Sequence, residues 1–80
     1  MIPKLDKKEL RKKIISLYKR YLSGEDIISE AQSYFMDYSG AEIFLDETLN
    51  NAIGYLENIG WNLKPQKEKV KYFVENLQKE

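Results

Sequence analysis

Apolar side chains recur at three- and four-residue spacing in four stretches of this 80-residue chain, and this periodicity limits the folds open to it. Positions i, i+3, i+4 and i+7 lie on one face of an α-helix, so each stretch predicts an amphipathic helix. The expected helices cover approximately residues 7–22, 29–38, 47–59 and 65–79. Four such helices with short connections favour an all-α fold, a small antiparallel four-helix bundle, with residues 1–80 as a single helical domain.

Each expected helix supplies one apolar stripe to a shared core. Trp61 and Leu63, in the connection before the fourth helix, are expected to close one end of that core. The run Ile43-Phe44-Leu45 is left open, as a segment packed under the helices or as an exposed interface of its own. The residues expected to point inward are Leu10, Ile14, Leu17, Tyr18, Tyr21, Ala31, Tyr34, Phe35, Tyr38, Leu49, Ala52, Ile53, Leu56, Ile59 or Tyr55, Val70, Phe73, Val74 and Leu77.

Capping residues mark the ends of the first two helices. Asp6 with Glu9 forms a variant of the capping box before the first helix, and Gly24 suits its C-terminal end. Ser29 with Gln32 predicts a second capping box. An earlier start of the second helix, capped by Asp26, is the alternative.

The third and fourth helices carry similar signals. Asp46 is placed to cap the third helix and Gly60 to end it. Gly54, inside that helix, predicts a close contact with a neighbouring helix, because glycine otherwise only weakens a helix. Pro65 is expected as the first residue of the fourth helix.

Charge is sorted along the chain although the net charge is zero. Residues 1–22 carry eight Lys or Arg against two carboxylates, and residues 64–80 carry five Lys against three Glu. Residues 23–63 contain eight carboxylates and no Lys or Arg. Asymmetry of this kind bears on partners and association, not on the fold.

Composition argues against catalysis. The chain has no Cys and no His, which removes thiol nucleophiles, the usual general base near neutral pH and zinc sites of the Cys/His type. Its glycines are isolated, so no phosphate-binding loop is present. We therefore expect no enzyme, no cofactor and no metal. The sequence shows no targeting segment and no apolar run that would span a bilayer, so a cytoplasmic protein is expected.

The acidic middle of the chain is the first candidate site. Clustered carboxylates attract a basic protein partner, and Tyr is a frequent anchor of interfaces. The alternative is that the carboxylates are merely solvated while the Tyr rings pack in the core. The residues predicted to bind a partner are Glu30, Tyr34, Asp37, Tyr38, Asp46, Glu47 and Tyr55.

The basic first helix is the second candidate. Lys8, Lys12, Lys19 and Arg20 fall mostly opposite its apolar stripe, where they would contact nucleic-acid phosphates or an anionic membrane surface. The alternative is a solvated helix face balanced by the acidic middle. A small nucleic-acid-binding regulator is therefore the second functional hypothesis. Self-association, with the basic end of one copy on the acidic middle of another, is the third.

Three segments of the chain follow one another in a recognisable order: Leu17–Glu25, Ile28–Ala31 and the apolar helix Leu49–Gly60. In these segments the chain resembles small helical bacterial immunity proteins, the antidotes to toxins and bacteriocins. The resemblance lies in the order and the ends of the helices. It implies a non-enzymatic protein that binds one cognate toxin or bacteriocin and blocks it. An acidic antidote surface would suit a nuclease toxin. The basic first helix departs from that pattern and fits better an immunity protein that acts near the membrane.

Overall fold

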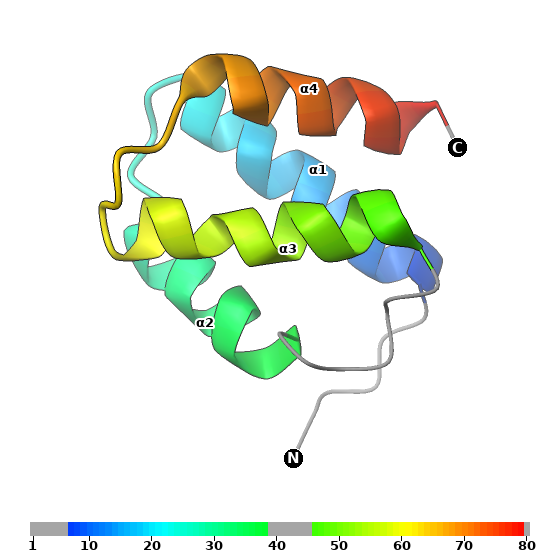
Figure 1. Cartoon of the computed structure of the whole chain (residues 1–80), viewed down its shortest axis with the longest axis horizontal. Coiled ribbons are helices and arrows are strands. Elements are labelled where there is room, and N and C mark those ends of the chain that lie inside the picture. The colour runs from blue at the N-terminus through cyan, green and yellow to red at the C-terminus, as the bar shows by residue number, and fades with distance from the viewer. Residues whose placement is uncertain (1–6, 39–45, 80) are drawn as a thin grey trace.

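The computed structural model describes residues 7–38 and 46–79, and within these residues the chain forms four α-helices and no strand. The helices are α1 (Lys7–Leu22), α2 (Ile28–Tyr38), α3 (Glu47–Gly60) and α4 (Lys67–Gln78). Successive helices run in alternating directions (Figure 1). The expected all-α four-helix bundle is confirmed. The expectations for Asp6 and for Ile43-Phe44-Leu45 fall outside the described residues.

The helices associate as two pairs. α2 packs mainly on α3, and α1 packs on α4, while smaller contacts join α3 to α4 and α1 to α3. The pairing follows the charge along the sequence, because α1 and α4 come from the two basic segments and α2 and α3 come from the stretch without Lys or Arg. The molecule therefore has a basic pair and an acidic pair of helices around one core.

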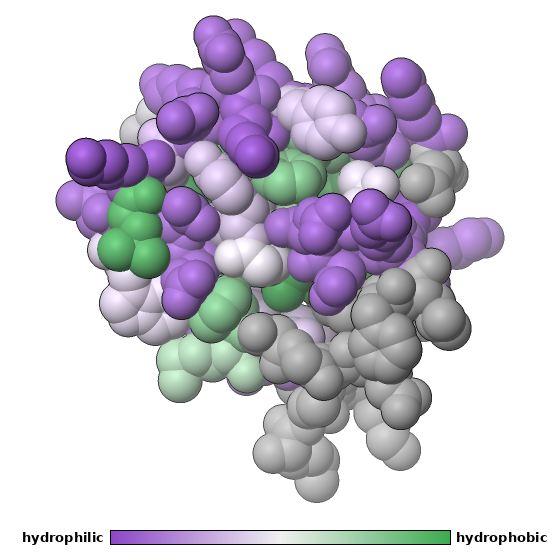
Figure 2. All heavy atoms as spheres, viewed as in Figure 1, coloured by the Kyte–Doolittle hydropathy of each residue, from purple (hydrophilic) through white to green (hydrophobic). Residues whose placement is uncertain are grey.

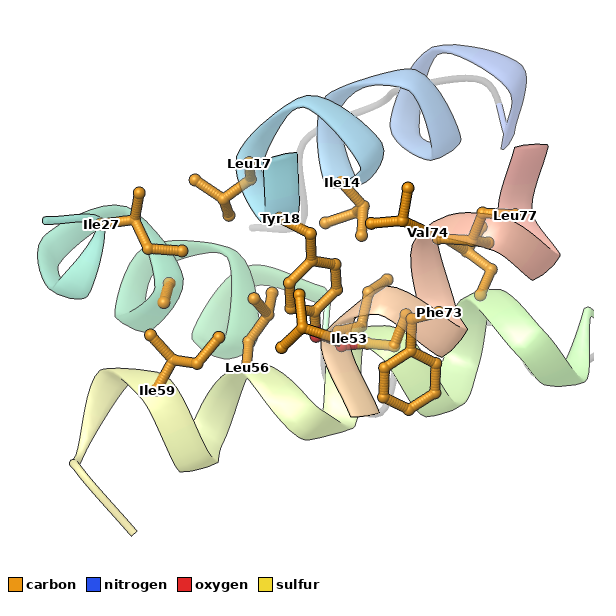
Figure 3. Close-up of a cluster of buried hydrophobic side chains, with 14 of the residues drawn as sticks. Ile14, Leu17, Tyr18, Ile27, Ile53, Leu56, Ile59, Phe73, Val74 and Leu77 are labelled. Atoms are coloured by element: carbon orange, nitrogen blue, oxygen red, sulfur yellow. Dashed lines mark hydrogen bonds between the residues drawn. The ribbon is translucent and has the colours of Figure 1, made fainter. Parts of the chain in front are cut away.

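The core lies where the apolar stripes of all four helices meet (Figure 3). Its centre is Tyr18, which is fully buried and points from α1 towards α3. The Tyr18 ring stacks on Phe73 with 6.0 Å between ring centroids. Its hydroxyl donates a hydrogen bond to the backbone carbonyl of Ala52, which satisfies the polar atom inside the core. Burial raises the pKa of the Tyr18 hydroxyl, because the phenolate would lose its hydration.

Helical periodicity predicted this core closely. Most residues of the expected stripes are buried, including Ile59, and Tyr55 is partly buried beside it. Ile27, which precedes α2, is a buried residue that the periodicity did not include. The expectation for Trp61 and Leu63 was wrong, because their exposed fractions are 44 % and 50 %. The loop after α3 carries these two side chains over the outside of the core.

Helix α2 begins one residue earlier than expected, and the Ser29–Gln32 capping box is not formed. The backbone N–H of Ile28 donates to Asp26 Oδ1 at 3.0 Å, and the N–H of Ala31 donates to the carbonyl of Ile27 at 2.8 Å. Ser29 therefore lies inside the first turn. The earlier start with Asp26 as the capping side chain describes this end better, and burial of Ile27 fixes the chain just before the helix.

Helix α4 begins at Lys67, so the expectation that Pro65 is its first residue was wrong. Gln66 stays extended, with φ −114° and ψ 126°. Its N–H donates to the Tyr55 hydroxyl at 2.7 Å, which ties this residue to α3. The carbonyl of Gln66 then accepts the first hydrogen bond of the helix, from Val70 at 3.2 Å. A tertiary contact, not the preference of proline, sets this boundary.

The end of α3 differs from the sequence expectation as well. Gly60 is the last helical residue, and Asn62, with φ 53°, takes the left-handed conformation that ends the helix. The N–H of Leu63 donates to the carbonyl of Asn58 at 2.7 Å, and the N–H of Asn62 donates to Ile59 at 3.4 Å. This pair of bonds is a Schellman motif. Helix α1 ends in the same motif with Gly24 at the left-handed position, as expected.

The close helix contact expected at Gly54 is absent. Gly54 is exposed, and a Cβ built there would meet nothing within 4 Å. The close approach occurs at Gly60 instead, where a Cβ would lie 2.9 Å from Gln32 Cγ and 3.2 Å from the Gln32 backbone nitrogen. Gln32 also donates from Nε2 to the Gly60 carbonyl at 2.7 Å, so this glycine is where α3 meets α2.

Candidate functional site

Glu30, one of the predicted partner-binding carboxylates, is already engaged by Arg20 of α1. Arg20 Nη1 and Nη2 each donate to one carboxylate oxygen of Glu30 at 2.7 Å, and Arg20 Nε donates to Glu25 at 2.6 Å. The hydrogen bonds from Arg20 hold the pKa of Glu30 below its usual range. The same hydrogen bonds, accepted by Glu30 and by Glu25, raise the pKa of Arg20. This cluster joins the end of α1 to the start of α2.

Asp46 has a structural role at the start of α3. Its Oδ1 accepts a hydrogen bond from the Leu49 N–H at 3.2 Å, which caps the helix as the sequence predicted. Its Oδ2 accepts from Arg11 of α1. Only 10 % of the Asp46 side chain is exposed, so this carboxylate connects α3 to α1 and presents little charge to solvent.

The three predicted tyrosines pack in or against the core. Tyr38 is buried, and its ring stacks on the half-buried Tyr34 with centroids 6.0 Å apart. Burial raises the pKa of Tyr38, and the neighbouring Tyr34 and Asp37 raise it further. Tyr55 packs on Phe73, with centroids 5.5 Å apart, and accepts the hydrogen bond that fixes the start of α4. Of these rings, Tyr34 and Tyr55 keep partial access to solvent.

The exposed negative charge of the acidic pair comes from other positions. Asp37 on α2 and Glu47 and Glu57 on α3 are exposed, and among the described residues none of the three is in an ion pair. Asp37 and Glu47 belong to the predicted set, whereas Glu57 does not. The structure thus divides the predicted acidic site into carboxylates that hold helices together and carboxylates that face solvent.

An apolar surface lies beside these exposed carboxylates, and sequence reasoning missed it. Ile28 and Met36 of α2 have exposed fractions of 46 % and 70 %, and Trp61 packs edge-on against Phe35 with centroids 5.6 Å apart. We call Ile28, Phe35, Met36 and Trp61 the α2 apolar surface. In Figure 2, apolar residues are visible over α2 and, separately, at the α3–α4 connection, with hydrophilic residues between them. The sequence does contain a signal for this surface, because α2 has more apolar residues than one buried stripe of a helix requires.

The basic residues of α1 separate into two groups. Lys8, Lys12 and Lys19 are exposed and follow the outer side of the helix, opposite the buried Leu10 and Leu17. They therefore form the single face that the sequence predicted. Arg20, the fourth member of the predicted set, lies on the side facing α2 and is bound to Glu25 and Glu30.

Within residues 7–38 and 46–79, no group of three or more His, Cys, Asp and Glu residues is placed to hold a metal ion. No helix in this part of the chain is long and apolar enough to cross a bilayer. The arrangement offers two surfaces for contact with other molecules, one acidic and partly apolar on α2 and α3, the other basic on α1. No family model, no curated protein and no solved structure matches the chain.

Proposed function

We propose that this protein is a non-enzymatic binding module that receives a basic protein partner on the α2–α3 pair. The observation that carries the proposal is the combination of charge and exposure in this pair. Residues 23–63 contain no Lys or Arg, and within this stretch Ile28 and Met36 of α2 and Trp61, directly after α3, are exposed. Apolar side chains that shed water supply binding energy, and the surrounding carboxylates steer a basic partner towards them.

Local contacts separate the residues proposed to touch the partner from those that hold the helices of the site in place. Asp37, Glu47 and Glu57 face solvent, so they are free to attract the partner. Trp61 and Met36 are the proposed anchors, because large apolar and aromatic groups dominate the energy of interfaces. Glu30, Asp46, Tyr38 and Tyr55 act indirectly, since the first two bind arginines of α1 and the two tyrosines pack in or against the core.

The partner that we propose is a toxin or bacteriocin, which makes the protein an immunity-type antidote. The order of the helices resembles that of small bacterial immunity proteins, and an acidic surface with an apolar centre suits a toxin with a basic functional surface. Binding alone would neutralise such a toxin, which agrees with a chain that has no Cys or His.

Affinity capture from a lysate of the source organism tests this proposal. The wild-type chain serves as bait beside two charge-matched variants, Asp37→Lys/Glu57→Lys on the α2–α3 pair and Glu68→Lys/Glu75→Lys on α4. We expect the wild type and the α4 variant to retain one basic protein and the α2–α3 variant to lose it, because reversed charges repel the partner. The captured protein, expressed alone in a bacterial host, should arrest growth, and co-expression of this chain should restore it.

The proposal is wrong if the α4 variant loses the captured protein and the α2–α3 variant keeps it. Circular dichroism of both variants shows whether either substitution has disturbed the fold. A further variant, Met36→Ser, removes an apolar anchor without any change of charge. It should accelerate dissociation of the captured complex more than it slows association, since anchors act mainly on the off-rate.

A further inference from the structure

The outer side of α1 is a cationic stripe with a small apolar floor. Lys12 and Lys19 flank Ile15 on this side, and Lys8 continues the same stripe towards the N-terminal end of the helix. Two adjoining surface depressions follow the stripe, and both include Lys12 and Ile15. One depression is also lined by Ser16 and by Ser23, whose hydroxyl donates to the Arg20 carbonyl at 2.8 Å. The other extends across to Leu77 and Gln78 of α4.

The antiparallel packing of α4 against α1 adds a second row of lysines. Leu77 and Gln78 lie beside the first half of α1. Figure 1 shows that the two helices run in opposite directions, so the residues of α4 that precede Leu77 run towards the C-terminal end of α1. From this direction we infer that Lys71 and then Lys67 follow the later turns of α1. Lys67, Lys71 and Gln78 share the α1 side of α4 by their four- and seven-residue spacing. We call Lys12, Lys19, Lys67 and Lys71 the α1–α4 basic face.

No ion pair among the described residues neutralises the lysines of this face. Among the described residues, Lys12, Lys19, Lys67 and Lys71 are all exposed, and none of them is in an ion pair. The neighbouring arginines behave differently, because Arg11 and Arg20 bind carboxylates of the acidic pair. Glu68 and Glu75 of α4 are exposed and lie three and four residues from Lys71, so they neighbour this lysine without an ion pair among the described residues.

We propose that the α1–α4 basic face binds the phosphate backbone of double-stranded DNA without reading its sequence. Lysine is depleted in protein interfaces, whereas contacts to phosphate are made mainly by basic and hydroxyl side chains. The face has lysines on both helices, and Ser16 and Ser23 lie beside the lysines of α1. It exposes no large apolar side chain that would insert into a membrane or anchor a protein.

The aromatic residues favour duplex over single-stranded nucleic acid. Binding of single strands usually relies on bases that stack on exposed aromatic rings. Tyr72 is the exposed ring of α4, and it lies against Phe73, turned away from α1. A regular array of phosphates is therefore the ligand that matches this face. The site is separate from the α2–α3 surface, so the inference stands independently of the proposed function.

Fluorescence anisotropy with a labelled duplex DNA of mixed sequence tests the inference, with the salt concentration varied at neutral pH. Four phosphate contacts predict a slope of log K against log salt of about −3.6, so a fourfold rise in salt should weaken binding roughly 150-fold. Duplexes of different sequence should bind with the same affinity. Absence of binding at low salt, or binding that does not respond to salt, overturns the proposal.

Two charge-matched variants locate the site. Lys12→Gln/Lys71→Gln removes one lysine of each helix from the α1–α4 basic face. Lys13→Gln/Lys69→Gln removes one lysine of each helix from other sides of the same two helices. We expect the first variant to reduce the magnitude of the salt slope by about 2 and the second to leave it unchanged. Equal losses in both variants overturn the assignment of the face.

Competition identifies the class of ligand. Duplex RNA, phosphatidylserine vesicles and poly-glutamate each compete against the labelled DNA. Duplex DNA that binds at least as tightly as each competitor supports the proposal. A competitor that binds more tightly overturns it in favour of RNA, a membrane surface or an acidic protein. Capture of the basic protein partner by Lys12→Gln/Lys71→Gln should be unchanged, which separates a failure here from a failure of the proposed function.

Discussion

Two glycines of α3 have opposite surroundings, which makes them a matched pair for a stability test. Gly54 is exposed with open space around it, whereas Gly60 is buried against Gln32. We expect Gly54→Ala to raise the free energy of unfolding by about 1 kcal/mol, because alanine loses less backbone entropy in a helix. Urea denaturation followed by circular dichroism measures the difference.

Gly60→Ala should lower the free energy of unfolding. The same helix preference favours alanine by about 1 kcal/mol, but the new Cβ crowds the Gln32 backbone, and overpacking of this kind costs roughly 1–3 kcal/mol. Gln32→Ala/Gly60→Ala relieves the contact at Cγ but also removes the hydrogen bond from Gln32 to the Gly60 carbonyl, so it is compared with Gln32→Ala alone. Gly60→Ala should cost less in the Gln32→Ala background than in wild type. A Gly60→Ala protein more stable than wild type would show that α2 and α3 do not meet at this residue.

Tyr18 makes stability sensitive to alkaline pH. Burial raises the pKa of Tyr18 above its ordinary value of 10.0, so the folded protein holds this proton when the unfolded chain releases it. The stabilisation is complete below pH 10 and falls as the pH rises above 10. We expect Tyr18→Phe to cost about 1 kcal/mol at neutral pH, through the lost hydrogen bond to Ala52.

The same substitution should flatten the alkaline decline, because phenylalanine does not ionise. The measurement is the free energy of unfolding between pH 8 and pH 11 for wild type and Tyr18→Phe. Tyr38 is present in both proteins and shifts in the same direction, so the difference between the two curves isolates Tyr18. Parallel curves above pH 10 would contradict the central burial of this hydroxyl.

At the scale of elements, Asp46 allows the contribution of a helix cap to be separated from that of an ion pair. Asp46→Ala removes both the bond to the Leu49 N–H and the partner of Arg11. Loss of the cap alone costs typically about 1 kcal/mol, so we expect at least that decrease in the free energy of unfolding. Asp46→Asn keeps a capping oxygen and should cost less. Asp37→Ala, at an exposed position without an ion pair, is the control and should be near neutral.

The elements also show what sequence reasoning can and cannot reach. The apolar stripes were predicted because helical periodicity repeats over several turns and reflects the burial of each helix as a whole. Helix ends were predicted less well, because they depend on single contacts from elsewhere in the fold. Tyr55 holds Gln66 outside α4, and Gln32 places Gly60 inside α3. Neither contact can be read from residues adjacent in sequence.

The candidate sites show the same limit. The sequence identified the acidic and basic segments but could not tell which carboxylates are used inside the molecule. Arg20 engages Glu30 and Arg11 engages Asp46 only because α1 is tied to α2 and α3 in space. The pairing of α4 with α1 likewise adds Lys67 and Lys71 to a face that the sequence assigned to α1 alone.

At the scale of the whole molecule, opposite charges gathered on two helix pairs predict association that depends on salt. The chain has zero net charge and a sequence pI near 6.3, so repulsion between copies is weakest near that pH. We expect light scattering near pH 6.3 to show self-association at low ionic strength that reverses as salt is added, because salt screens contacts between basic and acidic faces. A constant monomeric mass at every salt concentration would rule out this third hypothesis.

The order of the two helix pairs along the chain has a consequence for how the molecule forms. α2 and α3 are consecutive, whereas α1 and α4 meet only after the whole α2–α3 pair has been enclosed between them. Closing the larger loop costs more chain entropy, so the α1–α4 contact should form after the rate-limiting step. Leu77→Ala, in that contact, should then mainly accelerate unfolding, and Ile59→Val, in the α2–α3 pair, should mainly slow folding in stopped-flow measurements. The α1–α4 basic face would thus form last during folding and be lost first during unfolding. The ability to bind an anion on this face would therefore show that α1 and α4 have come together.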